Sequence, residues 1–488
     1  MNNYNYNHFT KCVGKELSAP LKSTFWALIC GILQKGVNVI TTPIFTRLLS
    51  TSEYGQYNVF NSWLQITTII VSLNISAGVF HQGLVKFEDD SKRFASSMQG
   101  LSTTLTIIWL IVYLPFYKYW NSLLSLTTIQ VLSMILLIWL SAIIGFWSAE
   151  QRNRYKYKTL IAVTLTASIL SPVLSITLIK NSEDKVTARI LGSVIIAFIV
   201  YIPLYIIQLK KGKQFFSGYY WKYAILFNLP LVPHYLSQVV LSSSDRIMIE
   251  RMVSDSAAGI YSLAYSLALI LTILNNALLQ TLNPWVYQKI KSKEINKIAP
   301  IAYASLIGIA VINLLLICVA PEIIKIFAPL EYYEAIWVVP PVTISVFFMY
   351  CYDMFAKFEF YYEKRFFITL ASIIGAALNI VLNFIFIKKY GYIAAGYTTL
   401  ACYILYAIGH YIFMNIVCQK YCGGVKPYNT KKIVLISCVF TLAGLSILFT
   451  YDYPYIRFAL LVVFILVAVL LRKKIIKFVR TVLSLRNT

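Results

Sequence analysis

RLLSTSEYGQY (Arg47 to Tyr57) and RMVSDSAAGIY (Arg251 to Tyr261) are the stretches that decide the fold of this 488-residue chain. The two copies stand at a constant offset of 204 residues, from 47 to 251, and five of their eleven positions match. Each copy connects the first and second long apolar runs of its half, so we expect two halves in parallel orientation. The matching pairs are Arg47 with Arg251, Ser50 with Ser254, Ser52 with Ser256, Gly55 with Gly259, and Tyr57 with Tyr261.

The composition, 59% hydrophobic and only 13% charged, is typical of a polytopic membrane protein. Windows of about 19 residues predict about fourteen transmembrane helices, six in each half and two more at the C-terminus. The predicted fold class is therefore an all-α polytopic membrane protein. The predicted spans are 21–44, 54–84, 94–116, 128–149, 159–179, 188–207, 221–242, 257–284, 298–327, 335–352, 367–387, 393–417, 433–449 and 455–471.

A basic and aromatic segment, QLKKGKQFFSGYYWK (Gln208 to Lys222), interrupts the apolar runs near the middle of the chain. Such a segment suits the inner membrane surface and reads as a linker. The predicted organisation is an N-terminal six-helix bundle (1–208), a cytoplasmic linker (209–220), a C-terminal six-helix bundle (221–419), and two helices with a basic cytoplasmic tail (420–488).

The chain carries 43 Lys and Arg against 19 Asp and Glu, a net charge of +24. Counted on alternate sides of the membrane, the basic residues of one side outnumber those of the other about three to one, which marks the cytoplasmic side. Both termini are therefore predicted to be cytoplasmic. The charge indicates topology and contact with anionic membrane lipids, and it does not indicate nucleic acid binding.

The chain resembles the bacterial flippases for O-antigen or capsule repeat units, a polysaccharide transporter family within the multidrug/oligosaccharidyl-lipid/polysaccharide exporter superfamily. The resemblance implies a MATE-like fold in which two six-helix bundles form a V, located in the bacterial cytoplasmic (inner) membrane. It also implies a lipid-linked oligosaccharide substrate on polyprenyl pyrophosphate, and as candidate partners the repeat-unit polymerase and the chain-length regulator. It is strongest in PIFTRLLSTSEYGQYNVF (Pro43 to Phe60), NLPLVPHYLSQVVLSSSDRIMIERMVSDSAAGIYSLAY (Asn228 to Tyr265) and LNIVLNFIFIKKYGYIAAGYTTL (Leu378 to Leu400).

Lys35 lies about 14 residues into the first span, which at about 1.5 Å per residue is roughly 21 Å into the membrane. A lysine at the centre of a span costs about 2.5–3.5 kcal/mol and is normally retained for a wet cavity or a partner. Asn38 and Thr42 lie on the same helix face. Because a flippase needs a polar lane for pyrophosphate and sugar, we expect these three residues to bind substrate.

Further polar residues are predicted to line the same cavity. Asn58, Asn61 and Gln65 form a stripe on the second span, and Asn276 and Gln280 form one on the eighth. Each stripe also fits interhelical hydrogen bonding. His234, midway along the seventh span, fits either a binding and proton site or a hydrogen-bonded packing residue.

Charged residues gather at the outer ends of the first and seventh spans, where they fit either a gate or an exposed, weakly stabilising cluster. Pro230 and Pro233 are predicted to bend the seventh span, as a moving hinge or as a static kink. The predicted gate consists of Arg47, Asp245, Arg246 and Arg251.

Two other transport functions stay open from the sequence: an ion-coupled drug or small-molecule antiporter of the same superfamily, and a flippase for another lipid-linked glycan such as a peptidoglycan precursor. An antiporter needs an acid within the membrane, whereas all nineteen acids are expected in loops or near span ends and the deepest charge is Lys35. No cofactor, metal site or catalytic residue is predicted, and coupling to protons or sodium is left open. The outer loops leave little room for an enzyme domain.

Overall fold

The computed structural model describes residues 19–484, and of residues 19–29, 32, 365, 479, 483 and 484 only the backbone. The chain ends, which were predicted to be cytoplasmic, lie outside the described residues. This part of the chain is helical throughout and contains no strand. The α-helices are α2 (Ala19–Leu48), α3 (Thr51–Ser72), α4 (Val79–Lys86), α5 (Ser91–Tyr113), α6 (Tyr117–Leu124), α7 (Thr128–Asn153), α8 (Tyr157–Lys180), α9 (Lys185–Gly212), α10 (Gly218–Asn228), α11 (Val232–Met252), α12 (Asp255–Lys291), α13 (Ile298–Cys318), α14 (Ala320–Phe327), α15 (Val339–Tyr361), α16 (Arg365–Tyr390), α17 (Ile393–Tyr421), α18 (Thr430–Leu448), α19 (Pro454–Leu470) and α20 (Arg472–Ser484).

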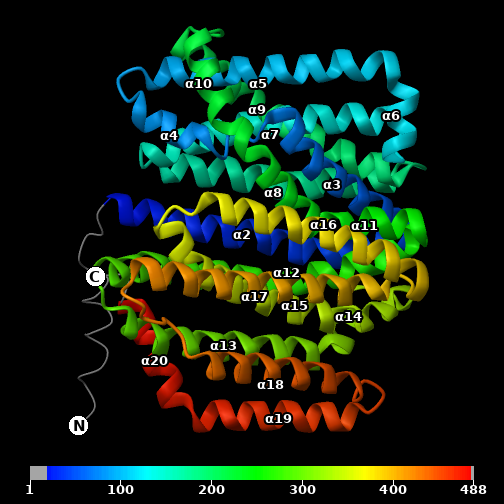
Figure 1. Ribbon diagram of the computed structural model, residues 1–488. Coiled ribbons are helices and arrows are strands. Elements are labelled where there is room, and N and C mark those ends of the chain that lie inside the picture. Colours follow the sequence, from blue (N-terminus) through cyan, green and yellow to red (C-terminus); the bar gives the residue numbers. More distant parts are fainter. Residues whose placement is uncertain (1–18, 485–488) are drawn as a thin grey trace, which may run out of the picture.

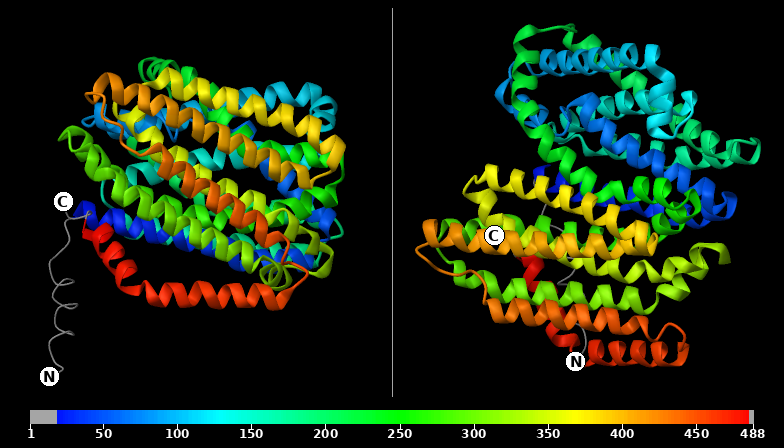
Figure 2. Two further views of the ribbon diagram at one scale, coloured as in Figure 1. Left: turned by 60° about the horizontal axis from the view of Figure 1, so that its bottom comes forward. Right: turned by 45° about the vertical axis from the view of Figure 1, so that its right-hand side comes forward.

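The long helices run side by side along one direction (Figures 1 and 2). We call α2–α9 the N-terminal half and α11–α17 the C-terminal half. In Figure 1 the helices α5–α9 lie on one side of the bundle, and α13, α18 and α19 lie on the opposite side. The short helices α6 and α14 lie at one end of the bundle, whereas α4 and α20 lie at the other end.

Eleven helices of the described chain are long and apolar enough to cross a membrane, or twelve if the bent pair α19–α20 is counted as one more span. The prediction of fourteen spans is therefore not confirmed in number. The first predicted span coincides with α2, and the second, 54–84, covers α3 and α4; none of these helices is among the eleven. The all-helical polytopic class is confirmed.

The seventh span is interrupted where its prolines were predicted to bend it. Helix α10 ends at Asn228, Pro230 lies in the 3₁₀ helix η2 (Leu229–Leu231), and α11 begins with Pro233 in its first turn. Proline lacks an N–H and disrupts the helical hydrogen-bond ladder, which explains the break. The helix then continues beyond the predicted end at residue 242 as far as Met252.

The two copies of the repeat form the starts of α3 and α12 in the same way. Ser50 caps α3 by accepting a hydrogen bond from the Glu53 N–H, and Ser254 caps α12 by accepting one from the Ala257 N–H. Just inside each helix lies a glycine at the contact between the halves. A Cβ on Gly55 would lie 1.9 Å from the Asp255 carbonyl oxygen, and one on Gly259 would lie 2.1 Å from the Thr51 carbonyl oxygen. Only glycine permits this approach of the two helices.

Candidate functional site: a polar chamber closed at one end

Two adjoining cavities lie between the helices of the N-terminal half and α12. The larger has a volume of about 450 Å³ and a wall rich in amides and hydroxyls. Four predicted substrate-binding residues, Asn38, Thr42, Asn58 and Asn61, lie on this wall. The structure therefore brings the polar faces of α2 and α3 together. The other polar side chains lining it are Gln34, Thr41, Tyr54, Tyr57, Ser168, Ser171, Ser175, Arg189, Ser193 and Ser266.

The smaller cavity, of about 260 Å³, lies between α2 and α12. Lys35 is exposed and lines it together with apolar residues of α12 such as Leu267 and Ile270. Asn38, Thr42 and Ser266 line both cavities, which are therefore neighbours, and we call the two together the chamber. The chamber thus has a polar part within the N-terminal half and a less polar part that carries the Lys35 ammonium.

The other predicted substrate-binding residues lie elsewhere. Gln65 accepts a hydrogen bond from Ser243 at 3.5 Å, across the two halves. His234 is half-buried, with its Nδ1 3.1 Å from the Ser372 hydroxyl. Asn276 and Gln280 are exposed on α12 and line neither cavity.

Two of the predicted gate residues, Arg47 and Arg251, reach across to the opposite half. Arg47 Nη2 donates to the Ile326 carbonyl at 2.8 Å, in the last turn of α14. Arg251 Nη2 donates to the Leu123 carbonyl, in the last turn of α6. The repeat offset of 204 residues relates position 123 to 327, next to Ile326, so the two contacts are almost symmetric. A cation at a helix C-terminus also interacts favourably with the helix dipole.

Further hydrogen bonds join the halves beside these arginines. Thr46 donates to the Phe327 carbonyl at 2.6 Å, Thr51 to the Ser256 hydroxyl at 3.2 Å, and Gln56 to the Asp255 carboxylate at 2.9 Å. We call these contacts, with those of Arg47, Arg251, Gly55 and Gly259, the latch. The latch lies at the end of the bundle that carries α6 and α14 (Figure 1), so the halves are joined at that end.

Asp245 and Arg246, the other predicted gate residues, lie inside the C-terminal half. Asp245 is fully buried and accepts hydrogen bonds from Tyr261 at 2.6 Å, Asn383 at 2.6 Å and Thr399 at 2.8 Å. Arg246 is also buried, against the ring of Tyr265. The expectation that every acid lies in a loop or near a span end is therefore wrong for Asp245, because α11 extends past it.

A second buried acid escaped the sequence analysis. Glu359 of α15 is fully buried and lies 2.9 Å from His410 Nδ1 of α17. The tenth span was predicted to end before Glu359, which assigned this acid to a loop. The extension of α15 to Tyr361 brings it into the packed interior of the C-terminal half.

Arg189, near the start of α9, is the functional candidate that the sequence analysis missed. Its side chain is buried, 9% exposed, and lines the larger cavity. The guanidinium lies 3.9 Å from the ring centroid of Phe45 and 3.5 Å from that of Tyr57. One signal for Arg189 was present in the sequence: this charged residue is the second residue of the predicted sixth span, 188–207.

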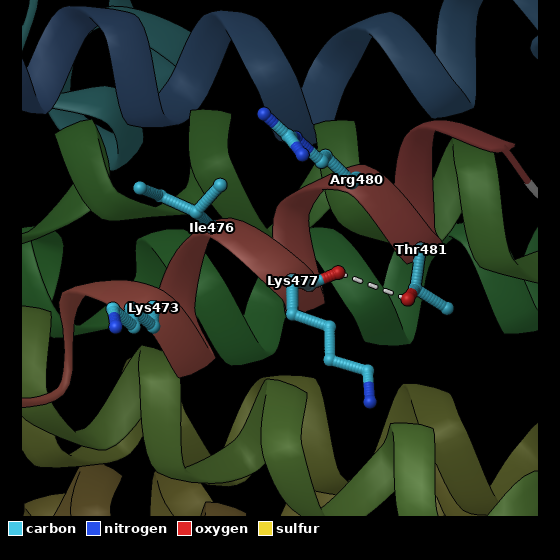
Figure 3. A pocket seen from close by; sticks show the side chains of 5 residues that line it. All are labelled: Lys473, Ile476, Lys477, Arg480 and Thr481. Atoms are coloured by element: carbon cyan, nitrogen blue, oxygen red, sulfur yellow. Dashed lines mark hydrogen bonds between the residues drawn. The ribbon is translucent and has the colours of Figure 1, made fainter.

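Helix α20, which is bent by 67° from α19, carries a separate basic surface. A hollow of about 520 Å³ over this helix is lined by Lys473, Ile476, Lys477, Arg480 and Thr481 (Figure 3). Lys477 and Arg480 extend to opposite sides of the helix (Figure 3). A basic helix of this kind suits the surface of an anionic membrane.

The sequence matches the family described as polysaccharide biosynthesis protein over residues 21–290, more than half of the chain. Lsg locus putative protein 1 of Haemophilus influenzae is 24% identical, with 75% of this chain and 92% of that protein covered. The fold is similar to that of the lipid II flippase MurJ in an inward closed conformation, with TM-score 0.65, 16% identity, and coverage of 93% and 98%. A mutant of the MATE transporter VcmN of Vibrio cholerae has TM-score 0.56 and 14% identity, with coverage of 82% and 97%. The MATE-like fold predicted from the sequence is thus confirmed.

Proposed function

Since this chain belongs to the polysaccharide biosynthesis protein family, we propose that it is a flippase for polyprenyl-pyrophosphate-linked oligosaccharide repeat units of O-antigen or capsule. It moves them from the cytoplasmic to the periplasmic leaflet of the inner membrane. The observation that carries the proposal is the position of Lys35 on the wall of a polar chamber beside α12.

The chamber supplies what such a substrate needs inside a membrane. A sugar or a phosphate in hydrocarbon loses several kcal/mol for each unpaired polar group. The larger cavity offers amides, hydroxyls and aromatic side chains for sugar, and the Lys35 ammonium is a cationic donor for the pyrophosphate. The less polar cavity around Lys35 suits the start of the polyprenyl chain, since Leu267 and Ile270 contribute to its wall.

Alternating access follows if the latch opens while the opposite end closes. In the described state the latch holds the halves together at the end predicted to be periplasmic, so substrate enters from the other end. The break at Pro230 and Pro233 divides the seventh span into α10 and α11. Asn228 of α10 donates to the Leu73 carbonyl of the N-terminal half at 2.7 Å, whereas α11 carries Asp245 in the C-terminal half. The prolines are therefore suited to serve as the hinge between the halves.

Two alternative transport functions are each supported by a specific observation. The similarity of the fold to the lipid II flippase MurJ favours a peptidoglycan precursor as substrate. The buried acids Asp245 and Glu359 favour ion coupling, as an antiporter requires. Both alternatives use the same chamber, and they differ from the proposal in what crosses the membrane.

The test is complementation of a strain that lacks its repeat-unit translocator. We expect the wild-type protein to restore surface polysaccharide and Lys35→Ala to leave the lipid-linked unit on the inner leaflet, with Lys35→Arg retaining more export than Lys35→Ala. Lys118→Ala, which removes an exposed lysine of α6, is the matched control at equal protein level. Equal export by wild type and Lys35→Ala excludes the proposed role of Lys35. Rescue only of a strain lacking a lipid II flippase would support the peptidoglycan alternative.

A further inference from the structure

Arg189 is a buried cation without a counter-ion. Among the described residues no carboxylate lies within 4.0 Å of its guanidinium, and its Nε and Nη1 atoms have no hydrogen-bond partner. The rings of Phe45 and Tyr57 stabilise the charge through cation–π contacts, but an aromatic face accepts no hydrogen bond of normal strength. Buried charged groups in proteins are normally paired, and Arg189 lines the larger cavity, so an anionic ligand held there can supply the missing partner of the charge.

The surroundings of Arg189 indicate the chemistry of that ligand. Asn58, Asn61, Ser171 and Ser193 line the same cavity of about 450 Å³, which falls within the about 300–1,000 Å³ of ordinary small-molecule sites. Hydroxyl and amide side chains beside an aromatic ring are typical partners of sugars. The arginine therefore lies in the part of the chamber that is best suited to the glycan.

Lys35 and Arg189 are too far apart to share one diphosphate. Arg189 contacts the ring of Phe45, which is ten residues beyond Lys35 on α2 and hence about 15 Å farther along the helix axis. Long side chains on a helix lean toward its N-terminus, so Lys35 and Phe45 lean in the same direction and this separation is kept. The two phosphorus atoms of a diphosphate are bridged by a single oxygen and cannot meet both cations. The chamber thus has two separate anion-binding positions.

We infer that Arg189 binds a negatively charged group carried by the glycan itself, a carboxylate or phosphate on a sugar, and thereby selects acidic repeat units. The inference rests on the proposed function, because it assumes that a lipid-linked glycan fills the chamber. Lys35 meets the diphosphate, and the guanidinium forms charge-assisted hydrogen bonds with the acidic sugar. A neutral glycan leaves Arg189 without an anion.

The experiment measures binding to the purified protein in nanodiscs by native mass spectrometry. Three probes share one short polyprenyl diphosphate and differ in the sugar: glucose, glucuronic acid, or glucose 6-phosphate. We expect wild type to bind at least one acidic probe about tenfold more tightly than the glucose probe, the ratio that one charge-assisted hydrogen bond provides. The two acidic probes distinguish a carboxylate from a phosphate.

The variants separate a binding role from a packing role. Arg189→Gln should lose the preference for the acidic probe while keeping its affinity for the glucose probe, and Arg189→Lys should retain part of the preference. Lys35→Gln should weaken all three probes alike. Lys185→Gln, one turn away on α9 and paired with Glu53 at 3.8 Å, is the control and should change nothing.

Equal binding of acidic and neutral probes by wild type overturns the inference and leaves the proposed function intact. Uniform weakening by Arg189→Gln also overturns it, because the residue then contacts the diphosphate or only supports packing. If Arg189→Gln fails to fold, as judged by its melting temperature, the inference is tested by two other results. These are the binding of acidic against neutral probes by wild type and the preference that Arg189→Lys retains. If wild type binds none of the probes, the proposed function itself fails, and the inference fails with it.

Discussion

Tyr57 and Tyr261 occupy equivalent positions of the repeat, and each contacts a buried charge of its own half. The ring of Tyr57 stacks on the Arg189 guanidinium at 3.5 Å, whereas the Tyr261 hydroxyl donates to the Asp245 carboxylate at 2.6 Å. One repeated position therefore supports a cation in the N-terminal half and an anion in the C-terminal half. The two equivalent positions thus support charges of opposite sign, and the polar cavity lies on the side of Arg189.

Asp245 should contribute strongly to stability, because three donors in the packed interior depend on its carboxylate. Asp245→Leu leaves Tyr261, Asn383 and Thr399 without their acceptor, and we expect a loss of about 3 kcal/mol or more. Thermal unfolding in detergent measures this loss of stability. Asp452→Leu, at an exposed aspartate, is the control. Equal melting temperatures for the two variants would show that the network adds little.

The sequence predicted part of the chamber at the level of residues. Helical spacing assigned Asn38 and Thr42 to one face of α2, and Asn58 and Asn61 to one face of α3, and all four residues line one cavity. The same spacing did not reveal the depth at which α12 meets the chamber. Residues of α12 between Ser266 and Ile273 line the chamber, whereas Asn276 does not. Helical periodicity alone cannot predict which turns of a helix reach a cavity.

The starts of α3 and α12 are the elements on which the closed state depends. Each is capped by a repeat serine and each presents a repeat glycine to the other helix. The last turns of α6 and α14 receive the repeat arginines. Ser52 and Ser256, a fourth repeated position, hydrogen-bond across the halves with Asp255 at 3.5 Å and Thr51 at 3.2 Å. Four of the five repeated positions are thus explained by a cap, a close approach or a contact across the halves.

Adding a methyl group at either glycine should force the latch open. In Gly55→Ala or Gly259→Ala the new Cβ would lie about 2 Å from a backbone carbonyl oxygen, so α3 and α12 must separate. Spin labels at positions 118 and 325, on the exposed surfaces of α6 and α14, should report longer distances by double electron–electron resonance. Gly308→Ala is the control, because no atom lies within 4 Å of its Cβ position. An unchanged distance distribution would contradict this account of the glycines.

Neutralising the latch arginines should have nearly equal effects in the two halves. Arg47→Ala and Arg251→Ala each remove a charged donor to a helix C-terminus, which at an exposed site is worth about 0.5–1.5 kcal/mol. Each should raise periplasmic labelling of Asn38→Cys, in a background without native cysteines, by about two- to tenfold. Lys118→Ala should leave the labelling rate unchanged. No increase in either variant would argue against a gate of this composition.

Hydropathy predicted helices but not where they break. The windows 54–84, 221–242 and 298–327 each merged two helices, since a short turn between apolar segments barely alters an average over about 19 residues. Pro230 and Pro233 predicted one of these breaks because proline acts on the backbone directly. The turn after α3, which contains Leu73 and Asn74 in left-handed conformation, had no comparable signal.

At the scale of the whole molecule, the proposed transport cycle requires the two halves to part at the latch. Parallel halves of this kind are suited to rocking about a site held between them. The chamber lies directly beneath the latch, because Tyr54 and Tyr57 of its wall follow Thr51 on α3. The eleven-residue repeat was enough to predict two parallel halves. It could not predict at which end of the bundle the halves are joined, because that depends on the contacts of the latch.

The most direct test of this requirement is to cross-link the latch. Thr51 and Ser256 lie on opposite halves with hydroxyl oxygens 3.2 Å apart, so Thr51→Cys with Ser256→Cys brings two thiols together. The matched control joins two helices of one half: native Cys30 with Thr164→Cys, whose Sγ and Oγ1 atoms lie 3.0 Å apart. All other cysteines are removed, and export of the lipid-linked unit is measured before and after oxidation. We predict that oxidation abolishes export through the Thr51–Ser256 pair, that reduction restores it, and that the Cys30–Thr164 pair exports normally throughout. Undiminished export with the Thr51–Ser256 disulfide fully formed would contradict the claim that the halves must separate there.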